Sequence, residues 1–545
     1  MKNKLEEEIK SVLKKMGIEN PRVNLDYPVH IEKGDYSTNV AMAYAKELHK
    51  KPMDLAEEIK THLEASLPSG VVRVEVVAPG FINFFFDSDY FAKNISRPIE
   101  KILKGQKVVI EYTDPNPFKE FHIGHLMPNV IGESISRVIE ANGAEVKRAN
   151  YQGDVGLHVA KAVWAMKKGI DLKDAYASGY KAYEEDVTAK QEIIDINKKI
   201  YDKSDKEINE IYENGRKKSL LYFEVLYKKF GTKFDFYFFE SEVAEFGKET
   251  VEKNIGKIFE KSDGAIVFKG ENYDKKLHTR VFITKEGLPT YEAKELGLSK
   301  IKYNKYPYNV SVIVTGNEIN EYFKVLLKAM SLVFPDLASK TKHLSHGMMR
   351  LPEGKMSSRT GNIISAENLI NQVKEKITSS HKIDNATAEV IAIGAIKFTI
   401  LRQAIGGDII FDFDKSISFE GDSGPYLQYS TVRANSLLKK ATERERGSTE
   451  ASRPNVPENW QTTNLERLLE RFPSVVARAG TEYAPHHIVT YLVDLAGEFN
   501  SFYASHKIID PEDPTSPYRL ALTDAFSQVM TTGLNLLGIR VPEKM

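Results

Sequence analysis

The spacing of apolar residues near the start of the chain predicts a small α/β module over residues 1–88. Apolar positions recur three to four residues apart in three segments, as they do on one face of a helix. Two further segments alternate or run apolar, as strands do. The expected helices are residues 4–16, 41–50 and 52–67, and the expected strands are residues 72–76 and 81–86.

Short β-branched runs alternate with amphipathic stretches over residues 105–390. Val108–Ile110 and Val310–Val314 are apolar runs of the kind that forms buried parallel strands. This alternation predicts an α/β fold with a parallel sheet, whose ligands bind at the carboxyl ends of the strands. Between about residues 168 and 255, charged residues recur at helical spacing, which favours a solvated helical insertion.

The last part of the chain, residues 391–545, has a mostly helical pattern. Ile488, Leu492, Leu495 and Phe499 repeat at a spacing of three to four residues, so one face of this segment is apolar. Such a face is buried when helices assemble into a bundle. The sequence therefore predicts an all-α domain at this end.

The residue totals narrow the class of protein. A length of 545 residues suggests about three to four domains. There is no run of about 18 apolar residues and no apolar signal region, so we expect no membrane span and a cytoplasmic location. Zero cysteines exclude disulfides and cysteine-bound zinc. The chain has 76 basic and 76 acidic residues, so any nucleic-acid surface must be a local patch.

The stretch 108–132 combines a strand, a turn and the start of a helix. The apolar run ends at Glu111, two prolines mark the turn, and helical spacing begins near His125. Such a helix start offers free backbone N–H groups to phosphate oxygens. His122 and His125 flank this turn and can donate to a phosphate, while Gly124 leaves room for a ligand. Taken alone, a His-x-x-His pair is more often structural or metal-binding.

A second motif, Gly354–Arg359, lies about 230 residues further on. In this order, the two motifs resemble the paired signatures of the class I aminoacyl-tRNA synthetases. The resemblance implies that both histidines and Lys355 act in catalysis. Ser358 stands where most class I enzymes have a second lysine, so Lys355 or Arg359 must supply the cation that meets the phosphates. The implied ATP-binding residues are His122, Gly124, His125, Lys355, Ser357, Ser358 and Arg359.

Tyr291 and Glu295 lie four residues apart, so on a helix they share one face. A phenol and a carboxylate placed in this way can bind a guanidinium through charge-assisted hydrogen bonds. The alternative is a surface glutamate beside a packing tyrosine. The segment resembles the Gly-x-Pro-Thr-Tyr turn and the Tyr-x-x-x-Asp pair of the arginyl-tRNA synthetases, with Glu295 in place of the usual aspartate.

The resemblance to the arginyl-tRNA synthetases extends over nearly the whole chain. Residues 34–39 and 79–84 resemble segments of the N-terminal domain of that family, which contacts the outer corner of the tRNA. Residues 426–545 resemble its helical anticodon-binding domain. The implied fold is α/β: a class I Rossmann-like parallel-sheet catalytic core, a small α/β N-terminal domain and an all-α C-terminal anticodon-binding bundle.

The resemblance also implies contacts to arginine and to tRNA. The implied arginine-binding residues are Glu111, Asn116, Asp154, Tyr291 and Glu295, with Asn116 at the α-amino group. The implied tRNA-binding residues are Asn39, Asn83 and Tyr503. Their structural alternatives are that Asn39 caps a helix, that Asn83 ends a strand and that Tyr503 packs in a core.

The implied function is that of an arginine–tRNA ligase. Arginine and ATP give arginyl-adenylate and pyrophosphate, and the terminal ribose hydroxyl of tRNA(Arg) then accepts the arginyl group. ATP with Mg²⁺ is expected, and no cluster of metal ligands is evident in the sequence. The expected partners are tRNA(Arg), L-arginine and ATP, and the enzyme is expected to be a monomer.

Three other interpretations remain open. A small-molecule adenylyltransferase also has a His-x-Gly-His turn, but the length and the helical C-terminal part argue against it. A class I synthetase for another amino acid is less compatible with Tyr291 and Glu295. A catalytically silent RNA-binding relative is less compatible with the intact histidines and Lys355. Exchange of pyrophosphate into ATP, with each amino acid in turn, distinguishes them.

Overall fold

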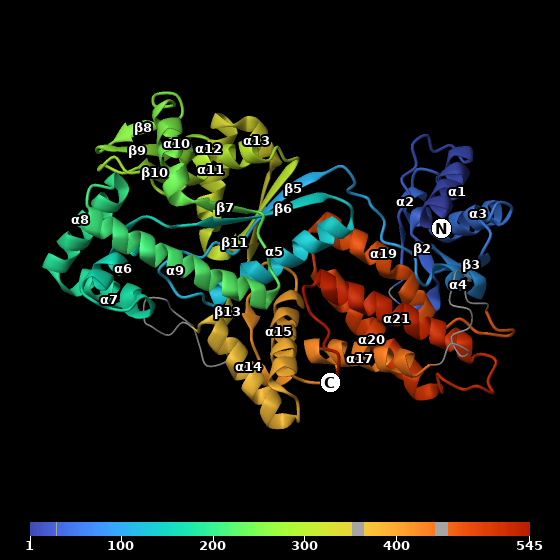
Figure 1. Cartoon of the computed structure of the whole chain (residues 1–545). Helices are drawn as coiled ribbons and strands as arrows, with labels where there is room; N and C mark the ends of the chain where they lie inside the picture. Colours follow the sequence, from blue (N-terminus) through green and yellow to red (C-terminus); the bar gives the residue numbers. More distant parts are fainter. Residues whose placement is uncertain (29, 351–363, 442–455) are drawn as a thin grey trace. The chain divides into compact units, whose positions relative to one another are not determined.

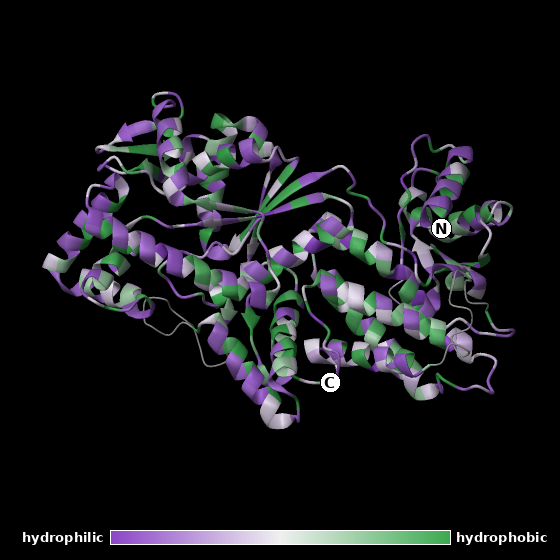
Figure 2. Ribbon diagram, in the orientation of Figure 1, coloured by the Kyte–Doolittle hydropathy of each residue, from purple (hydrophilic) through white to green (hydrophobic). Residues whose placement is uncertain are grey.

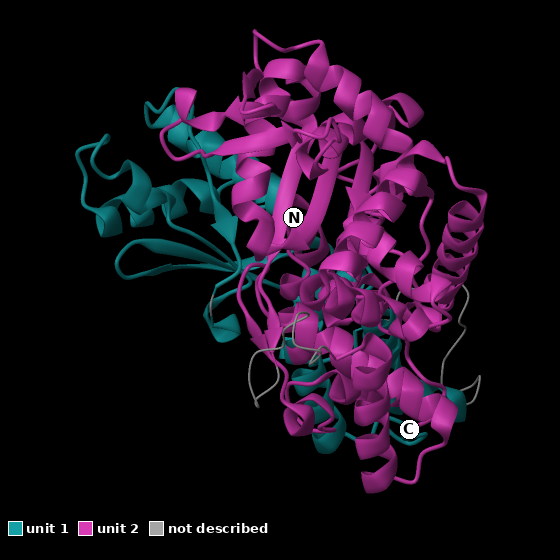
Figure 3. Cartoon of the chain, turned by 90° about the vertical axis from the view of Figure 1, so that its left-hand side faces the viewer, with its two compact units in different colours: residues 1–98, 433–474, 494–531 teal, residues 99–432, 475–493, 532–545 magenta. Residues whose placement is uncertain are grey.

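The computed structural model describes residues 1–28, 30–350, 364–441 and 456–545 (Figure 1). The chain forms two compact units, which Figure 3 colours separately. Unit 1 comprises residues 1–98, 433–474 and 494–531, and unit 2 comprises residues 99–432, 475–493 and 532–545. No described helix is long and apolar enough to span a membrane.

A five-stranded sheet forms the centre of unit 2, and all its neighbouring strands are parallel. Its order is β12-β11-β5-β6-β7, so the chain runs outward from β5 to β7 and then returns to β11 on the other side of β5. Ligands of such sheets bind where the order reverses, at the carboxyl ends of β5 and β11. The strands are β5 (Lys107–Glu111), β6 (Glu145–Gln152), β7 (Phe236–Phe239), β11 (Val310–Gly316) and β12 (Thr341–His346). The predicted parallel strands at 108–110 and 310–314 are therefore confirmed.

Helices cover this sheet (Figure 1). The helix that directly follows β5 is α5, which packs against β5, β6 and β11. The strands carry hydrophobic runs, whereas the outer helices α8 and α9 are largely hydrophilic (Figure 2). Along the chain, the helices of this unit outside the 157–230 segment follow β5, β7, β11 and later strands. They are α5 (Ile123–Ala141), α10 (Glu240–Glu252), α11 (Tyr291–Lys305), α12 (Asn320–Val333), α13 (Pro335–Lys340), α14 (Ala366–Ser380), α15 (Asn385–Leu401) and α16 (Phe413–Ser416).

Four helices lie between β6 and β7, in agreement with the helical insertion predicted from the charge pattern. They are α6 (Leu157–Lys167), α7 (Leu172–Glu185), α8 (Val187–Asp202) and α9 (Lys206–Phe230). A small antiparallel sheet separates α10 from α11. Its strands are β8 (Glu260–Ser262), β9 (Ala265–Lys269) and β10 (Thr279–Ile283), and a separate pair is β13 (Met349–Arg350) with β14 (Ile409–Ile410).

The C-terminal residues of unit 2 are hydrogen-bonded to helix α5. Ser134 Oγ donates to the carbonyl of Leu536 at 3.0 Å, and the guanidinium of Arg137 donates to the carbonyl and side chain of Asn535 at 3.0 and 2.7 Å. Nearby, the ammonium of Lys397 donates to the carbonyl of Gly538 at 2.6 Å. Both α5 and α15 are therefore fixed by residues that follow them by more than 140 positions.

The N-terminal part of unit 1 is the predicted α/β module. Its antiparallel sheet has the order β1-β2-β4-β3 and packs against α1 and α3 through Leu5, Ile9, Leu55 and Phe84. The two short strands β1 and β2 were not predicted, and the second helix is shorter than expected. The elements are α1 (Lys2–Lys15), β1 (Leu25–Asp26), β2 (Tyr36–Thr38), α2 (Val40–Tyr44), α3 (Pro52–Glu64), β3 (Val71–Val77), β4 (Phe81–Phe86) and α4 (Ser88–Asn94).

In its described residues, the C-terminal part contains four long helices, as the apolar spacing predicts. Each contributes residues to both units. They are α17 (Gly424–Lys440), α19 (Asn464–Glu482), α20 (His486–Ser505) and α21 (Ser516–Leu536).

Glu470 of α19 joins the N-terminal module to the helical residues of unit 1. It is 2% exposed and accepts a hydrogen bond from the hydroxyl of Tyr90 at 2.9 Å. The guanidinium of Arg97 lies 3.5 Å from the same carboxylate, and Asp35 pairs with Arg467 at 2.9 Å. Because these groups are buried and hydrogen-bonded, the module is not an appendage that can be removed without exposing polar core groups.

Replacing Glu470 by Gln is therefore expected to destabilise unit 1. The amide still accepts from Tyr90 but no longer compensates the charge of Arg97, and a hydrogen bond to a charged buried group contributes about 1–3 kcal/mol. Calorimetry should show a lower Tm than that of the wild type. Glu482→Gln, an exposed position on the same helix, is the control and should change Tm little. An equal shift in both variants would mean that Glu470 has no special role.

Candidate active site

The histidine motif begins the helix α5, where His122 is the N-cap residue. Its Nδ1 accepts the backbone N–H of Gly124 at 3.1 Å, and Nδ1 of His125 accepts the backbone N–H of His122 at 3.3 Å. The two rings are stacked, with centroids 3.8 Å apart. Because each Nδ1 accepts a hydrogen bond, each neutral ring carries its proton on Nε2.

Both rings are neutral in the physiological range. Burial, assisted by the nearby Lys119, lowers the pKa of His122 to about 4. Burial and the charges of His122 and Lys119 hold the pKa of His125 well below its ordinary value. The start of α5 thus offers two neutral N–H donors to an anion without requiring a proton from solvent.

Gly124 has a structural role beside the predicted one, which stays a prediction. A Cβ at this position would lie 2.9 Å from Cε1 and Nδ1 of His122, which is closer than real Cβ contacts. The glycine therefore makes room for the capping ring of His122, and its backbone is also exposed. Access for a ligand is compatible with this geometry, but the close approach of the His122 ring is by itself enough to account for a glycine at this position.

The second motif lies outside the described residues. This applies to Lys355, Ser357, Ser358 and Arg359, whose ATP-binding roles stay predictions.

Lys119 is a cation near the histidines that the sequence analysis did not single out. Its charge lowers the pKa of His122, His125 and His158, and its ammonium lies 4.7 Å from the ring centroid of Tyr176. Burial and the neighbouring Lys161 lower the pKa of Lys119 itself. Its position three residues before His122 in the turn was the signal that could have found it.

Four carboxyl groups meet beside the end of β5, and we call them the carboxyl cluster: Glu111, Asp114, Glu240 and Glu295. The charge of Glu111 acts on both Asp114 and Glu295, and that of Glu240 acts on Glu295. The cluster stands at the sheet position where the strand order reverses, since Glu111 is the last residue of β5. A cationic ligand is the natural counterpart of this site.

Glu295 lies in the first part of α11, so the predicted helix is confirmed. Its side chain is buried, at 7% exposure, whereas Tyr291 one turn earlier is 56% exposed. Burial and the charge of Glu111 raise the pKa of Glu295 to about 8, which Lys302 partly opposes. Lys302 itself forms an ion pair with Glu111, with Nζ 2.7 Å from Oε2.

Asn116 is half-buried next to the cluster. Its Oδ1 accepts the backbone N–H of Gly153 at 3.1 Å. A Cβ at Gly153 would lie 2.4 Å from Asn116 Oδ1 and 3.0 Å from Glu240 Oε1, so only glycine lets both groups approach. The amide N–H₂ of Asn116 is the part of this side chain that can serve a ligand.

Asp154 was predicted to bind arginine, but its carboxylate is already engaged. It is fully buried, and Oδ1 accepts the backbone N–H of Ser241 at 2.9 Å. Its Oδ2 accepts from Arg216 Nε at 2.9 Å and from the hydroxyls of Ser241 and Tyr212 at 2.7 and 3.4 Å. This geometry disfavours a direct contact to arginine and gives Asp154 the role of joining β6 to α9 and α10.

The three predicted tRNA-contacting residues differ in exposure. Asn39 is exposed, and although it occupies the N-cap position of α2 its side chain makes no capping hydrogen bond. Asn83 is only 4% exposed, and its Oδ1 accepts from Ser37 Oγ at 2.6 Å, so a direct RNA contact is disfavoured. Tyr503 is 38% exposed, with the guanidinium of Arg433 5.1 Å from its ring centroid.

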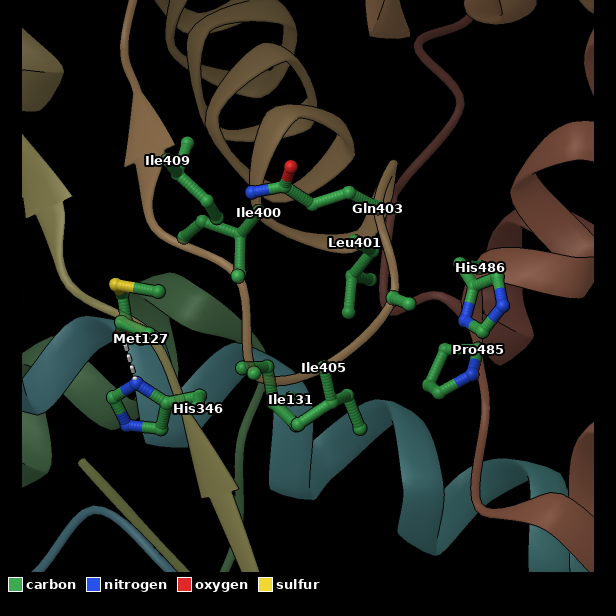
Figure 4. Close-up of a pocket in the computed structure, with 14 residues that line it drawn as sticks. Met127, Ile131, His346, Ile400, Leu401, Gln403, Ile405, Ile409, Pro485 and His486 are labelled. Carbon is green, nitrogen blue, oxygen red and sulfur yellow. Dashed lines mark hydrogen bonds between the residues drawn. The ribbon is translucent and has the colours of Figure 1, made fainter. Parts of the chain in front are cut away.

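The turns of α5 that follow the histidines line a small, mainly apolar pocket (Figure 4). Met127 and Ile131 face Leu401 and Ile405 across it, and His346 donates from Nδ1 to the carbonyl of Gly347 at 2.7 Å. These contacts hold α5 against α15 and the segment that follows it.

Three family models match the chain. The model "Arginyl tRNA synthetase N terminal domain" matches residues 3–86, "tRNA synthetases class I (R), catalytic domain" matches residues 93–413, and "DALR anticodon binding domain" matches residues 427–545. The arginine–tRNA ligase of Clostridium acetobutylicum is 30% identical, with 96% of each chain covered. That of Fusobacterium nucleatum is 31% identical, with 94% of this chain and 93% of the relative covered.

Solved structures agree with these relatives. The Thermus thermophilus arginyl-tRNA synthetase is similar over the whole of both chains, with a TM-score of 0.75 and 25% identity. The Plasmodium falciparum enzyme has the same fold, with a TM-score of 0.78 at 20% identity and coverage of 100% of this chain and 99% of that one. With three matching family models that together cover the N-terminal, catalytic and anticodon-binding parts, the chain belongs to the arginyl-tRNA synthetases, which are class I aminoacyl-tRNA synthetases.

Proposed function

We propose that this chain joins L-arginine to tRNA(Arg) with the α5 histidines at the phosphates and the carboxyl cluster at the guanidinium. The observation that carries this assignment is the juxtaposition of two neutral N–H donors with a buried acidic pocket at the end of β5. An anionic phosphate suits the first feature, and a cationic side chain suits the second.

In the first step, an arginine carboxylate oxygen attacks the α-phosphorus of ATP, and the bond to the β-phosphate oxygen breaks as pyrophosphate leaves. This chemistry requires alignment and charge neutralisation rather than a covalent nucleophile. Nε2–H of His122 and of His125 donate to the phosphate oxygens as negative charge develops. ATP arrives with Mg²⁺, which we assign to the substrate rather than to a protein site.

In the second step, the terminal ribose hydroxyl of the tRNA attacks the carbonyl of arginyl-adenylate, and AMP leaves. Asn39 and Tyr503 are exposed and available for RNA, and an aromatic ring such as Tyr503 can stack on an unpaired base. Asn83 supports the module from inside β4. A monomeric state and a cytoplasmic location stay predictions.

For the arginine substrate, we assign the guanidinium to Glu295, with Tyr291 at the rim and Glu111 held in place by Lys302. The amide of Asn116 serves the α-amino end. Asp154 acts indirectly, through the packing of α9 and α10 behind the pocket.

Exchange of radioactive pyrophosphate into ATP tests the proposal. Each of the twenty amino acids is supplied in turn, with and without tRNA(Arg). Exchange that depends on arginine supports the assignment. Exchange with a different amino acid, or with none, would refute it.

Lys119→Met is expected to slow arginine-dependent exchange by about tenfold or more. The ammonium beside the histidines would otherwise neutralise charge on the phosphates, and such electrostatic contributions are large in a buried site. The KM for arginine should change little. Lys168→Met is the control, because the ammonium of Lys168 also lies over an aromatic ring, that of Trp164, and is paired with Glu192. If Lys119→Met is as active as the control, the second motif supplies the cation alone.

A further inference from the structure

The buried carboxyl cluster contains more acidic groups than basic partners. Glu240 forms an ion pair with Lys294, with Nζ 2.6 Å from Oε2, and both side chains are at most 5% exposed. Glu111 forms an ion pair with Lys302 at 2.7 Å, and both are 2% exposed. These two pairs are each neutral.

Asp114 and Glu295 are the two carboxyl groups of the cluster that remain after these pairs are formed. In the described part of the chain neither forms a salt bridge, and Asp114 accepts only the backbone N–H of Tyr151 at 2.8 Å through Oδ1. Burial and the charges of Glu111 and Glu295 hold the pKa of Asp114 well above its ordinary value. Two carboxylates without cations in such a site cannot both be ionised at low cost.

The other groups that face Glu295 supply no further positive charge. Tyr151 of β6 and Tyr322 of α12 are buried phenols, and burial holds the pKa of each well above its ordinary value, so both are neutral. Arg280 of β10 is already paired with Glu292, at 3.3 Å, on the neighbouring part of α11. No further cation is thus available to Glu295 among the described residues, and a bound ligand can supply it.

We propose that Glu295 carries a proton while the pocket is empty and that arginine displaces it, so that one proton is released for each arginine bound. The guanidinium is permanently charged and replaces the proton as the partner of the carboxylate. The released proton passes to the buffer, and the charge of the pocket is unchanged. This inference rests on the proposed function of the cluster.

The direction of the pH dependence follows from this exchange. Below the pKa of the empty pocket, about 8, the proton competes with arginine. The KM for arginine should therefore fall by about tenfold for each pH unit between about pH 6 and about pH 8. The range ends there so that the α-amino group of arginine stays protonated.

The KM for ATP provides an internal control. His122 and His125 do not titrate in this range, since the pKa of His122 is lowered to about 4 and that of His125 lies well below its ordinary value. Burial lowers the pKa of Lys397 to about 7, but its contacts are with the carbonyls of Phe230 and Gly538 rather than with the pocket. Titration of Lys397 would change the KM for both substrates alike, whereas titration of Glu295 changes only the KM for arginine.

Calorimetry gives the direct test. Arginine is titrated into the full chain with tRNA(Arg) present, near neutral pH, in phosphate and in Tris. These buffers differ in ionisation enthalpy, so release of one proton makes the observed binding heats differ by that enthalpy. Equal heats in both buffers, or a KM for arginine that is flat over the pH range, would overturn the inference.

Two variants locate the proton. With Glu295→Gln the KM for arginine should be high but independent of pH, and a retained slope would show that another group titrates. Asp114→Asn keeps the Oδ1 acceptor for Tyr151 and removes one acid, so the midpoint of the KM profile should move to lower pH. A midpoint that does not move would contradict the carboxyl cluster as the origin of the pH dependence. A different outcome would refute the proposed function itself: a wild-type protein that does not activate arginine at any pH.

Discussion

Glu295→Gln is expected to raise the KM for arginine by roughly 30-fold to several thousand-fold, which corresponds to about 2–5 kcal/mol for a broken buried charge pair. Glu295 is buried and forms no ion pair in the described structure, since the nearby Lys302 is paired with Glu111, so the guanidinium would lose its counter-charge. The KM for ATP should hardly change, because the proposed site for the phosphates is the start of α5 and not the carboxyl cluster. Pyrophosphate exchange at varied arginine and ATP concentrations measures both.

Two variants make this result specific. Glu295→Asp, the usual residue of the family, should be milder than Glu295→Gln. Glu292→Gln alters a carboxylate of similar burial on the same helix that is paired with Arg280, and it should leave the KM for arginine near the wild-type value. Normal arginine activation by Glu295→Gln would make the exposed Glu318 the next candidate, since Asp154 is already bonded to Arg216.

His122→Ala and His125→Ala should each lower the rate of arginyl-adenylate formation by about 100-fold or more, because one lost donor to a transition-state charge typically has this effect. Binding of tRNA should be almost unchanged. Single-turnover kinetics measure the rate, and filter binding measures the affinity for tRNA.

His122 also caps α5, so its alanine variant tests two roles at once. His122→Asn separates them, because an asparagine at the N-cap can still accept the backbone N–H of Gly124 but has no Nε2–H donor. We expect this variant to be as slow as His122→Ala and more stable. A wild-type rate in His122→Asn would mean that the ring serves only as a cap.

The order of elements was largely predictable because it depends on local periodicity. The β-branched runs at 108–110 and 310–314 form strands of one parallel sheet, and the apolar repeat from Ile488 forms α20. The short strands β1 and β2 have two and three residues, which is too few for a period to appear. They exist because β4 offers a hydrogen-bonding edge to β2, and β2 in turn offers one to β1; sequence spacing does not describe such partners.

Within the site, the motifs indicated the residue types but not their partners. The spacing of Tyr291 and Glu295 predicted a shared helix face, yet only Glu295 is buried. The charge pattern of the insertion suggested solvated residues, whereas Arg216 is bonded to Asp154 across 62 positions. Long-range pairs of this kind decide which acid is available to a ligand, and they depend on tertiary packing.

The bonds between α5 and the end of α21 also set a time order for the appearance of activity. Ser134 and Arg137 contact residues that the ribosome adds about 400 codons later. A nascent chain can build the parallel sheet and place His122 and His125 in its turn, but it cannot complete the packing of the helix that holds them until Asn535 and Leu536 have emerged. The helix that carries the histidines thus reaches its final packing long after the histidines themselves have been made.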